Sequence, residues 1–169
     1  MEITLRSAAG LAAIEAVARA VPEMQVGAGT VTRASEVAQV LAAGARFGLS
    51  PGSTPELLAA VLAAGLPFVP GVASPSEAMA ARDAGFTLMK CFPAAQLGGV
   101  EVLKAWGGPL PDLRFCPTGG VSLANMGSFL ALPNVAMVGG SWLTPAAAVK
   151  AGDWAQITAL AAEARGLRG

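Results

Sequence analysis

A lysine, Lys90, stands inside the short apolar run LMKCFP at residues 88–93. The run is typical of a strand, and Pro93 ends it because proline has no backbone N–H for the ladder. Side chains alternate along a strand, so Lys90 shares a face with Leu88 and Phe92. A buried ammonium group is costly unless it is paired or loses its proton, and a neutral amine attacks ketones to form an imine. Lys90 is therefore either a nucleophile or a strand-end lysine that reaches solvent.

A second set of polar side chains lies at the start of the chain. Glu2, Thr4 and Arg6 alternate with apolar residues, so the three share one face of a predicted strand. A carboxylate can move protons, and a guanidinium can bind a substrate carboxylate through two parallel hydrogen bonds. A half-buried surface strand shows the same alternation. The pattern becomes specific only if Lys90 lies in the same site.

Composition limits the classes of function. Lys plus Arg and Asp plus Glu both number 11, and the formal net charge of zero predicts neither a nucleic-acid nor a membrane partner. Histidine, the commonest catalytic base and metal ligand, is absent. The two cysteines, Cys91 and Cys116, do not form a disulfide framework, so we expect reduced thiols in a cytoplasmic protein. The start of the chain lacks the pattern of a secretion signal.

Short apolar runs recur along the chain and alternate with alanine-rich segments of helical periodicity. Val26, Phe47, Phe68 and Met89 follow one another at intervals of 21 residues. We predict strands near residues 2–5, 25–28, 46–49, 67–70, 87–91, 114–116 and 135–139, with helices over 11–20, 34–43, 55–64 and 75–84 and a last one from 153 to about 165. The missing Leu-x-x-Leu-x-Leu pattern argues against a leucine-rich solenoid. The alternation indicates an α/β fold, a TIM (β/α)8-type parallel barrel with seven βα units in this chain.

The predicted helices carry recognisable ends. Ser35, Thr54, Ser74 and Asp153 stand where N-caps belong, Pro55 and Pro75 at first helical positions, and Gly44, Gly65 and Gly85 where helices end. These signals locate the helices between the predicted strands. The segments that remain between a strand and the next helix are the strand ends.

Glycine, proline and hydroxyl residues follow nearly every predicted strand. Such barrels build their sites at the carboxyl ends of the strands, where Thr30 and Thr118 supply hydroxyl groups. Two loops, Gly119-Gly120 and Gly139-Gly140-Ser141, follow the last two strands, where barrels often bind phosphate through backbone N–H groups. The alternative is that these glycines only allow tight packing between strand and helix. Because both loops show the pattern, we favour phosphate binding.

Taken in order, these segments resemble the 2-keto-3-deoxy-6-phosphogluconate (KDPG) and 4-hydroxy-2-oxoglutarate (KHG) aldolase family of class I aldolases. The matching motifs are EITLR at 2–6, VGAGT at 26–30, SPG at 50–52, PG at 70–71, KCFP at 90–93, GG at 98–99, RFCPTGG at 114–120 and GGSW at 139–142. They cover essentially all 169 residues, which we expect to form one barrel domain over 1–169. The resemblance implies a lyase of the Entner-Doudoroff pathway that cleaves KDPG to pyruvate and glyceraldehyde 3-phosphate.

The resemblance also implies a role for each candidate residue. Lys90 would form the imine, and Glu2 would relay the proton. Arg6 and Thr30 would bind the pyruvyl carboxylate, and Thr118 would orient the substrate. The residues that would hold the phosphate are Gly119, Gly120, Gly139, Gly140 and Ser141. No metal and no cofactor are implied, the partner is a phosphorylated oxo-acid, and we expect a homotrimer.

The chain departs from the family in one respect, because the family has another strand and helix before the glutamate strand, whereas Met1 directly precedes Glu2. We therefore expect a first βα unit to be missing and Glu2 to lie on an edge strand, with lower stability and activity than a chain in which that unit is restored. Two alternatives remain open. One is another phosphate-binding barrel, of the sugar-phosphate epimerase or thiamine-phosphate synthase type, and the other is a truncated relative without catalytic activity.

Overall fold

The computed structural model describes residues 1–166, so the last three residues of the predicted domain 1–169 lie outside it. Strands and helices alternate from the first residues onward. Their order is β1 (Glu2–Thr4), α1 (Gly10–Ala20), β2 (Gly27–Gly29), α2 (Ala34–Ala42), β3 (Phe47–Leu49), α3 (Pro55–Ala63), β4 (Phe68–Val69), β5 (Gly71–Val72), α4 (Pro75–Asp83), β6 (Leu88–Cys91), α5 (Gly99–Gly107), β7 (Arg114–Pro117), α6 (Leu123–Leu130), α7 (Ala146–Ala151) and α8 (Trp154–Gly166).

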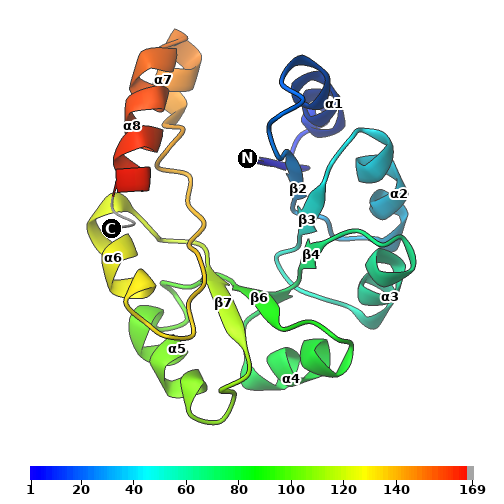
Figure 1. The fold of residues 1–169 in the computed structure, drawn as a ribbon, viewed down its shortest axis with the longest axis vertical. Helices are drawn as coiled ribbons and strands as arrows, with labels where there is room; N and C mark the ends of the chain where they lie inside the picture. The colour runs from blue at the N-terminus through cyan, green and yellow to red at the C-terminus, as the bar shows by residue number, and fades with distance from the viewer. Residues whose placement is uncertain (167–169) are drawn as a thin grey trace.

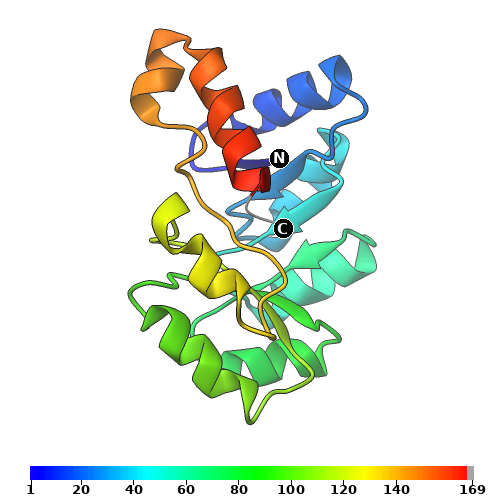
Figure 2. The ribbon, with the colours of Figure 1, turned by 60° about the vertical axis from the view of Figure 1, so that its left-hand side comes forward.

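All strand pairs in the described residues are parallel. One sheet has the order β1-β2-β3-β4 and the other the order β5-β6-β7, so within each sheet every strand lies beside the next one in the chain. The helices form an arc around the outside of the strands, which opens between α1 and the pair α7 and α8 (Figure 1). Figure 2 shows the same strands and helices after a turn of 60° about the vertical axis. This is the architecture of the predicted parallel barrel, with the carboxyl ends of the strands on one side.

Two of the predicted strands differ from those observed. The fourth, predicted over 67–70, is divided at Pro70 into β4 and β5, because proline has no N–H for the ladder. The segment 135–139 is not a continuous strand. It meets β7 through two bridges, Phe115 to Val135 and Thr118 to Gly139. Three residue steps along β7 thus face four along the partner, and the extra residue interrupts the ladder as a bulge does.

The predicted helix ends are largely confirmed. The side chains of Thr54 and Ser74 accept hydrogen bonds from Leu57 N and Glu77 N, and prolines occupy the first positions of both helices. Asp153 caps α8 by accepting from Gln156 N at 3.0 Å. The prediction for Ser35 is wrong.

Helix α2 begins at Ala34, as the predicted range 34–43 had it, and two residues earlier than a cap at Ser35 would require. The Glu36 carboxylate instead accepts hydrogen bonds from the backbone N–H groups of Thr32 and Arg33. An acidic side chain in the first turn therefore stabilises the start of α2 by binding the two N–H groups that precede the helix.

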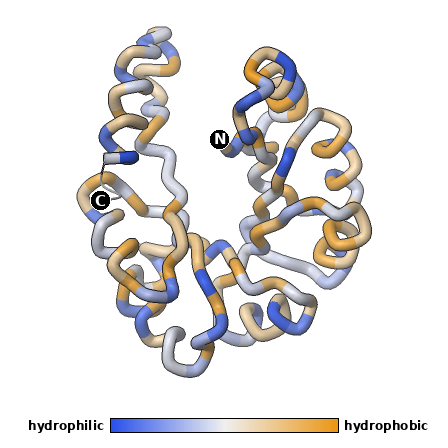
Figure 3. The backbone as a smooth tube through the Cα atoms, in the orientation of Figure 1, coloured by the Kyte–Doolittle hydropathy of each residue, from blue (hydrophilic) through white to orange (hydrophobic). Residues whose placement is uncertain are grey.

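The core lies between the strands and the inner faces of the helices. Phe115 of β7 is fully buried and meets Trp106 of α5 edge to face, with ring centroids 5.5 Å apart. Hydrophobic and hydrophilic residues alternate along the helices in Figure 3, as expected for helices that bury one face. Among residues 1–166, no helix has the length and apolar character needed to cross a membrane.

Candidate active site

Lys90 and Glu2 meet although they belong to different sheets. Lys90 lies on β6 and is only 5% exposed, and its Nζ is 3.7 Å from Oε1 of Glu2 on β1. The Lys90 Nζ also lies 5.3 Å from the centroid of the Phe92 ring. The carboxylate offsets part of the cost of burying the amine. The structure thus brings the amine of Lys90 and the carboxylate of Glu2 into one site, which the pattern at residues 2–6 alone could not show.

Glycines beside this pair leave space that side chains would fill. Gly29 is paired with Thr4, and a Cβ on Gly29 would overlap the Glu2 carboxylate. Gly71 is paired with Lys90, and a Cβ there would overlap the backbone of Pro51. The site is therefore shaped by absent side chains as much as by present ones.

The neighbouring strand β7 brings a thiol and a hydroxyl to the site. Cys116 is paired with Lys90 in the ladder, so the two side chains share a face. Thr118 Oγ1 donates to the Cys116 carbonyl at 3.3 Å and lies 3.8 Å from the Cys116 Sγ. Burial raises the pKa of the Cys116 thiol, and the Thr118 hydroxyl and the Lys90 charge only partly oppose that effect. The thiol is therefore protonated at neutral pH and is a poor nucleophile.

Arg6 and Thr30 lie just beyond the carboxyl ends of β1 and β2. Leu5 N donates to Gly29 O at 2.8 Å, which holds these two strand ends together. Arg6 is exposed, and its Nε donates to Thr4 Oγ1 at 3.4 Å. Thr30 has a φ of 60°, an uncommon conformation for a β-branched residue. Such conformations concentrate at functional sites, where the surrounding structure enforces them.

The two glycine loops lie next to each other. Thr118 is bridged to Gly139, where an added Cβ would come within 2.6 Å of the Thr118 hydroxyl. Gly119 and Gly120 have φ values of 92° and 75°, which side chains would strain. The loops therefore carry glycines where side chains would clash with neighbouring residues, and Ser141 is exposed at the end of the second loop.

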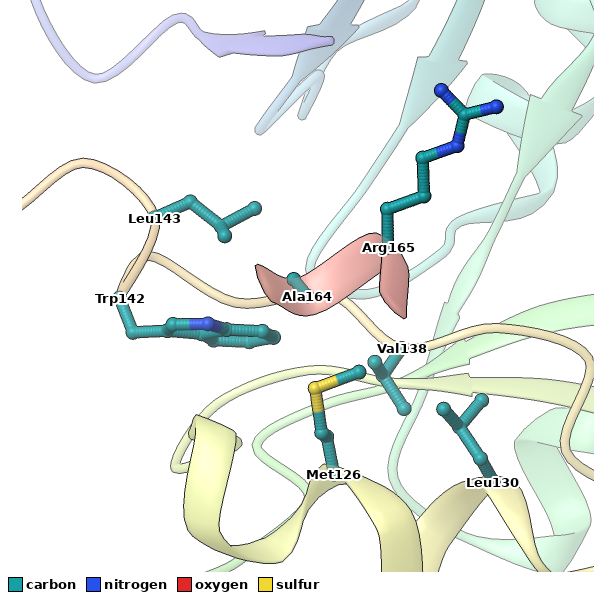
Figure 4. Close-up of a pocket in the computed structure, with 7 residues that line it drawn as sticks. All are labelled: Met126, Leu130, Val138, Trp142, Leu143, Ala164 and Arg165. Atoms are coloured by element: carbon teal, nitrogen blue, oxygen red, sulfur yellow. The ribbon is translucent and has the colours of Figure 1, made fainter. Parts of the chain in front are cut away.

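One residue near these loops, Trp142, was not among the predicted site residues. The ring of Trp142 occupies the space where a side chain on Gly140 would lie. Trp142 also lines an apolar pocket of about 250 Å³. Arg165 belongs to this pocket, but its side chain points away from the apolar side chains that line it (Figure 4). The other residues of that pocket are Met126, Leu130, Val138, Leu143 and Ala164. The Trp142 Nε1 is buried without a hydrogen-bond partner in the described structure.

Cys116, which lies beside Lys90, was likewise not among the predicted site residues, although the sequence contains a signal for its position. It stands two residues before Thr118, and alternation along the strand places both on one face. The register that sets Cys116 opposite Lys90 required the structure. Within residues 1–166, no three His, Cys, Asp or Glu side chains gather in the way a metal site would need.

Comparisons with known proteins now decide the family. The model of the KDPG and KHG aldolase family matches residues 1–160. The chain belongs to this family. It is 52% identical to the 2-dehydro-3-deoxy-phosphogluconate aldolase of Pseudoalteromonas atlantica, with 97% of the chain and 76% of the relative covered. The KHG/KDPG aldolase of Escherichia coli strain K12 is 49% identical, with 97% and 77% covered.

A solved structure gives the same result for the fold. The KDPG aldolase of Legionella pneumophila, which holds pyruvate captured at low pH as a covalent carbinolamine intermediate, superposes with a TM-score of 0.92. The two sequences are 46% identical, and the match covers 94% of this chain and 77% of the other. The predicted barrel and the predicted family are thus confirmed. The family match favours the aldolase over the epimerase and synthase types of barrel.

Proposed function

We propose that this chain is a class I aldolase that cleaves KDPG to pyruvate and glyceraldehyde 3-phosphate. The observation that carries the proposal is the buried Lys90 Nζ, 3.7 Å from the Glu2 carboxylate, in a chain of the KDPG and KHG aldolase family. The names of the relatives and the pyruvate adduct in the Legionella enzyme support it. The E. coli relative is named for both oxo-acids, so we include 4-hydroxy-2-oxoglutarate as a second substrate.

In the proposed reaction, Lys90 adds to the C2 ketone of the substrate, and loss of water gives an imine. The C3–C4 bond then breaks, and its electron pair moves toward the imine nitrogen to leave an enamine. The C4 hydroxyl loses its proton and becomes the aldehyde of glyceraldehyde 3-phosphate. The enamine takes a proton at C3, and water releases pyruvate and the free amine. Glu2 moves these protons, since its carboxylate is next to the lysine.

The remaining predicted site residues would hold the substrate. Arg6 and Thr30, at neighbouring strand ends, would bind the carboxylate of the pyruvyl part. Thr118 would orient the substrate beside Lys90, since β6 and β7 are paired. The phosphate would lie against the backbone of the glycine loops, formed by Gly119, Gly120, Gly139, Gly140 and Ser141.

We further propose that the chain acts as one barrel domain, as a homotrimer and in the cytoplasm. The two free thiols, Cys91 and Cys116, fit a reducing compartment. The low content of charged residues, 13%, fits a surface that is partly covered by other copies of the chain.

Borohydride trapping tests the proposed chemistry. Treatment with pyruvate and borohydride should attach a reduced three-carbon adduct, found by peptide mass spectrometry on Lys90, and Lys90→Ala should lose both the adduct and turnover of KDPG. Activity should persist in the presence of a chelator, because the imine accepts the electrons. An adduct on another lysine, or turnover that survives Lys90→Ala, would show that the proposed mechanism is wrong. Trapping without turnover of either oxo-acid would favour the non-catalytic relative.

A further inference from the structure

The two reactive side chains belong to sheets that are separated by a break in one strand. Glu2 lies in the sheet β1 to β4 and Lys90 in the sheet β5 to β7. Pro70 separates β4 from β5. The 3.7 Å separation of Lys90 Nζ and Glu2 Oε1 therefore depends on how the two sheets are held together at this point.

Two serines of the loop after β3 hold the first residue beyond the break. The backbone N–H of Gly71 donates to Ser50 Oγ at 3.1 Å, and Ser53 Oγ donates to the Gly71 carbonyl at 2.8 Å. Ser50 is also bonded to the first sheet, because its own N–H donates to Val69 O of β4 at 3.4 Å. One short loop thus binds both polar groups of the Gly71 residue and joins the two sheets.

Gly71 in turn is the ladder partner of Lys90. Two hydrogen bonds flank it, from Lys90 N to Pro70 O at 2.8 Å and from Phe92 N to Val72 O at 3.1 Å. A Cβ on Gly71 would overlap the backbone of Pro51, so the loop packs directly on this residue. A displacement of Gly71 is therefore transmitted through these bonds to the strand that carries Lys90.

The Ser50 hydroxyl lies at a fully buried position, 0% exposed. A buried hydroxyl costs free energy unless it is hydrogen-bonded, so packing alone would favour an alanine there. The hydrogen bond that the Ser50 hydroxyl accepts from Gly71 N is what favours serine over alanine at this position.

We propose that Ser50 is a positioning residue, supported by Ser53, that sets Lys90 against Glu2 by fixing Gly71. This inference rests on the proposed aldolase function. Imine formation needs Lys90 and a ketone, whereas proton transfer at C3 of the bound pyruvate needs Lys90 and Glu2 in register. Loss of the Ser50 hydroxyl should therefore slow proton transfer more than imine formation.

The test measures these two steps separately in the full chain. The rate of borohydride trapping with pyruvate reports imine formation, and exchange of the pyruvate methyl protons in deuterium oxide, followed by NMR, reports proton transfer. Ser50→Ala should lower the exchange rate roughly tenfold or more relative to the trapping rate, the scale expected for a misplaced catalytic group. Ser53→Ala should change the same ratio in the same direction but less, because Ser53 is only partly buried.

Thr54→Ala is the matched control in the same loop, because Thr54 caps α3 and has no hydrogen bond to Gly71 in the described structure. It should lower the melting temperature and leave the ratio of exchange to trapping unchanged. An equal fall of both rates in Ser50→Ala, or no change in either, overturns the proposal. If Ser50→Ala does not fold, an unchanged ratio in Ser53→Ala overturns it. A wild-type chain that traps no pyruvate would instead refute the proposed function.

Discussion

At the scale of single residues, the absent side chain of Gly29 is as important to the site as Glu2 itself. A Cβ at position 29 would overlap the Glu2 carboxylate, so Gly29→Ala should push that carboxylate away from Lys90. We expect kcat for KDPG cleavage to fall by roughly a hundredfold, the scale of a misplaced group, with little change in folding. Gly127→Ala in α6 is the control, because its Cβ would meet no neighbouring atom, and it should keep wild-type turnover. Wild-type kcat in Gly29→Ala would show that Glu2 does not need its observed position.

The buried thiol of Cys91 predicts a dependence of stability on pH. Burial, and then the neighbouring Cys116, raises the pKa of Cys91 from its ordinary value of 9.0 to about 11. The folded chain therefore keeps this proton at pH values where the unfolded chain has lost it. The free energy of unfolding should be insensitive to this group below pH 9 and should fall as the pH rises from 9 toward 11. Urea titrations of the wild type and Cys91→Ala across this range should show a steeper fall in the wild type, and parallel curves would contradict the assignment.

At the scale of secondary-structure elements, two hydroxyl residues near helix starts should respond differently to mutation. Thr54 caps α3 through its bond from Leu57 N at 3.2 Å, so Thr54→Ala should lower the free energy of unfolding by about 1 kcal/mol. Ser35 lies inside the first turn of α2 and is exposed, so Ser35→Ala should have almost no effect. Denaturant melts of the pair measure the difference. Equal losses would mean that Ser35 contributes to the start of α2 after all.

The helix starts differ in whether their caps can be predicted from the sequence. Thr54 and Ser74 were predictable because each precedes a proline at the first helical position. The cap of α2 was not predictable, although its first residue was, since Glu36 reaches back to Thr32 N and no local pattern separates that bond from a serine cap. Candidate residues at the strand ends were visible in the sequence. Their distances were not, because the Lys90–Glu2 contact joins residues from two sheets.

The breaks in the sheets depended on pairing rather than on composition. Pro70 is visible in the sequence as a residue without an N–H, but its effect depends on which neighbour would have accepted that bond. The sequence of the segment 135–139 is typical of a strand. That it has one residue more than β7 between their two bridges is known only from the pairing in the structure. Local patterns thus predicted the elements, and non-local pairing decided where they are interrupted.

At the scale of the whole molecule, the proposed trimer gives a direct measurement. Sedimentation equilibrium should find a species three times the mass of the 16.8 kDa chain over a range of loading concentrations. Association would cover apolar side chains such as Leu62 and Met79, which are 53% and 47% exposed in the single chain. A monomer at all concentrations would contradict the proposal and leave those side chains in water.

The contact between Trp142 and Gly140 makes the molecule its own optical probe. Indole fluorescence responds to the polarity and rigidity of the surroundings of the ring. The three tryptophans have different surroundings, because Trp106 is 6% exposed, Trp154 is 63% exposed, and Trp142 lies beside the second glycine loop. Replacing Trp106 and Trp154 by phenylalanine would leave Trp142 as the single emitter. Its emission should then change on titration with inorganic phosphate and stay constant with pyruvate, so occupancy of the two ends of the substrate site could be followed separately without a label.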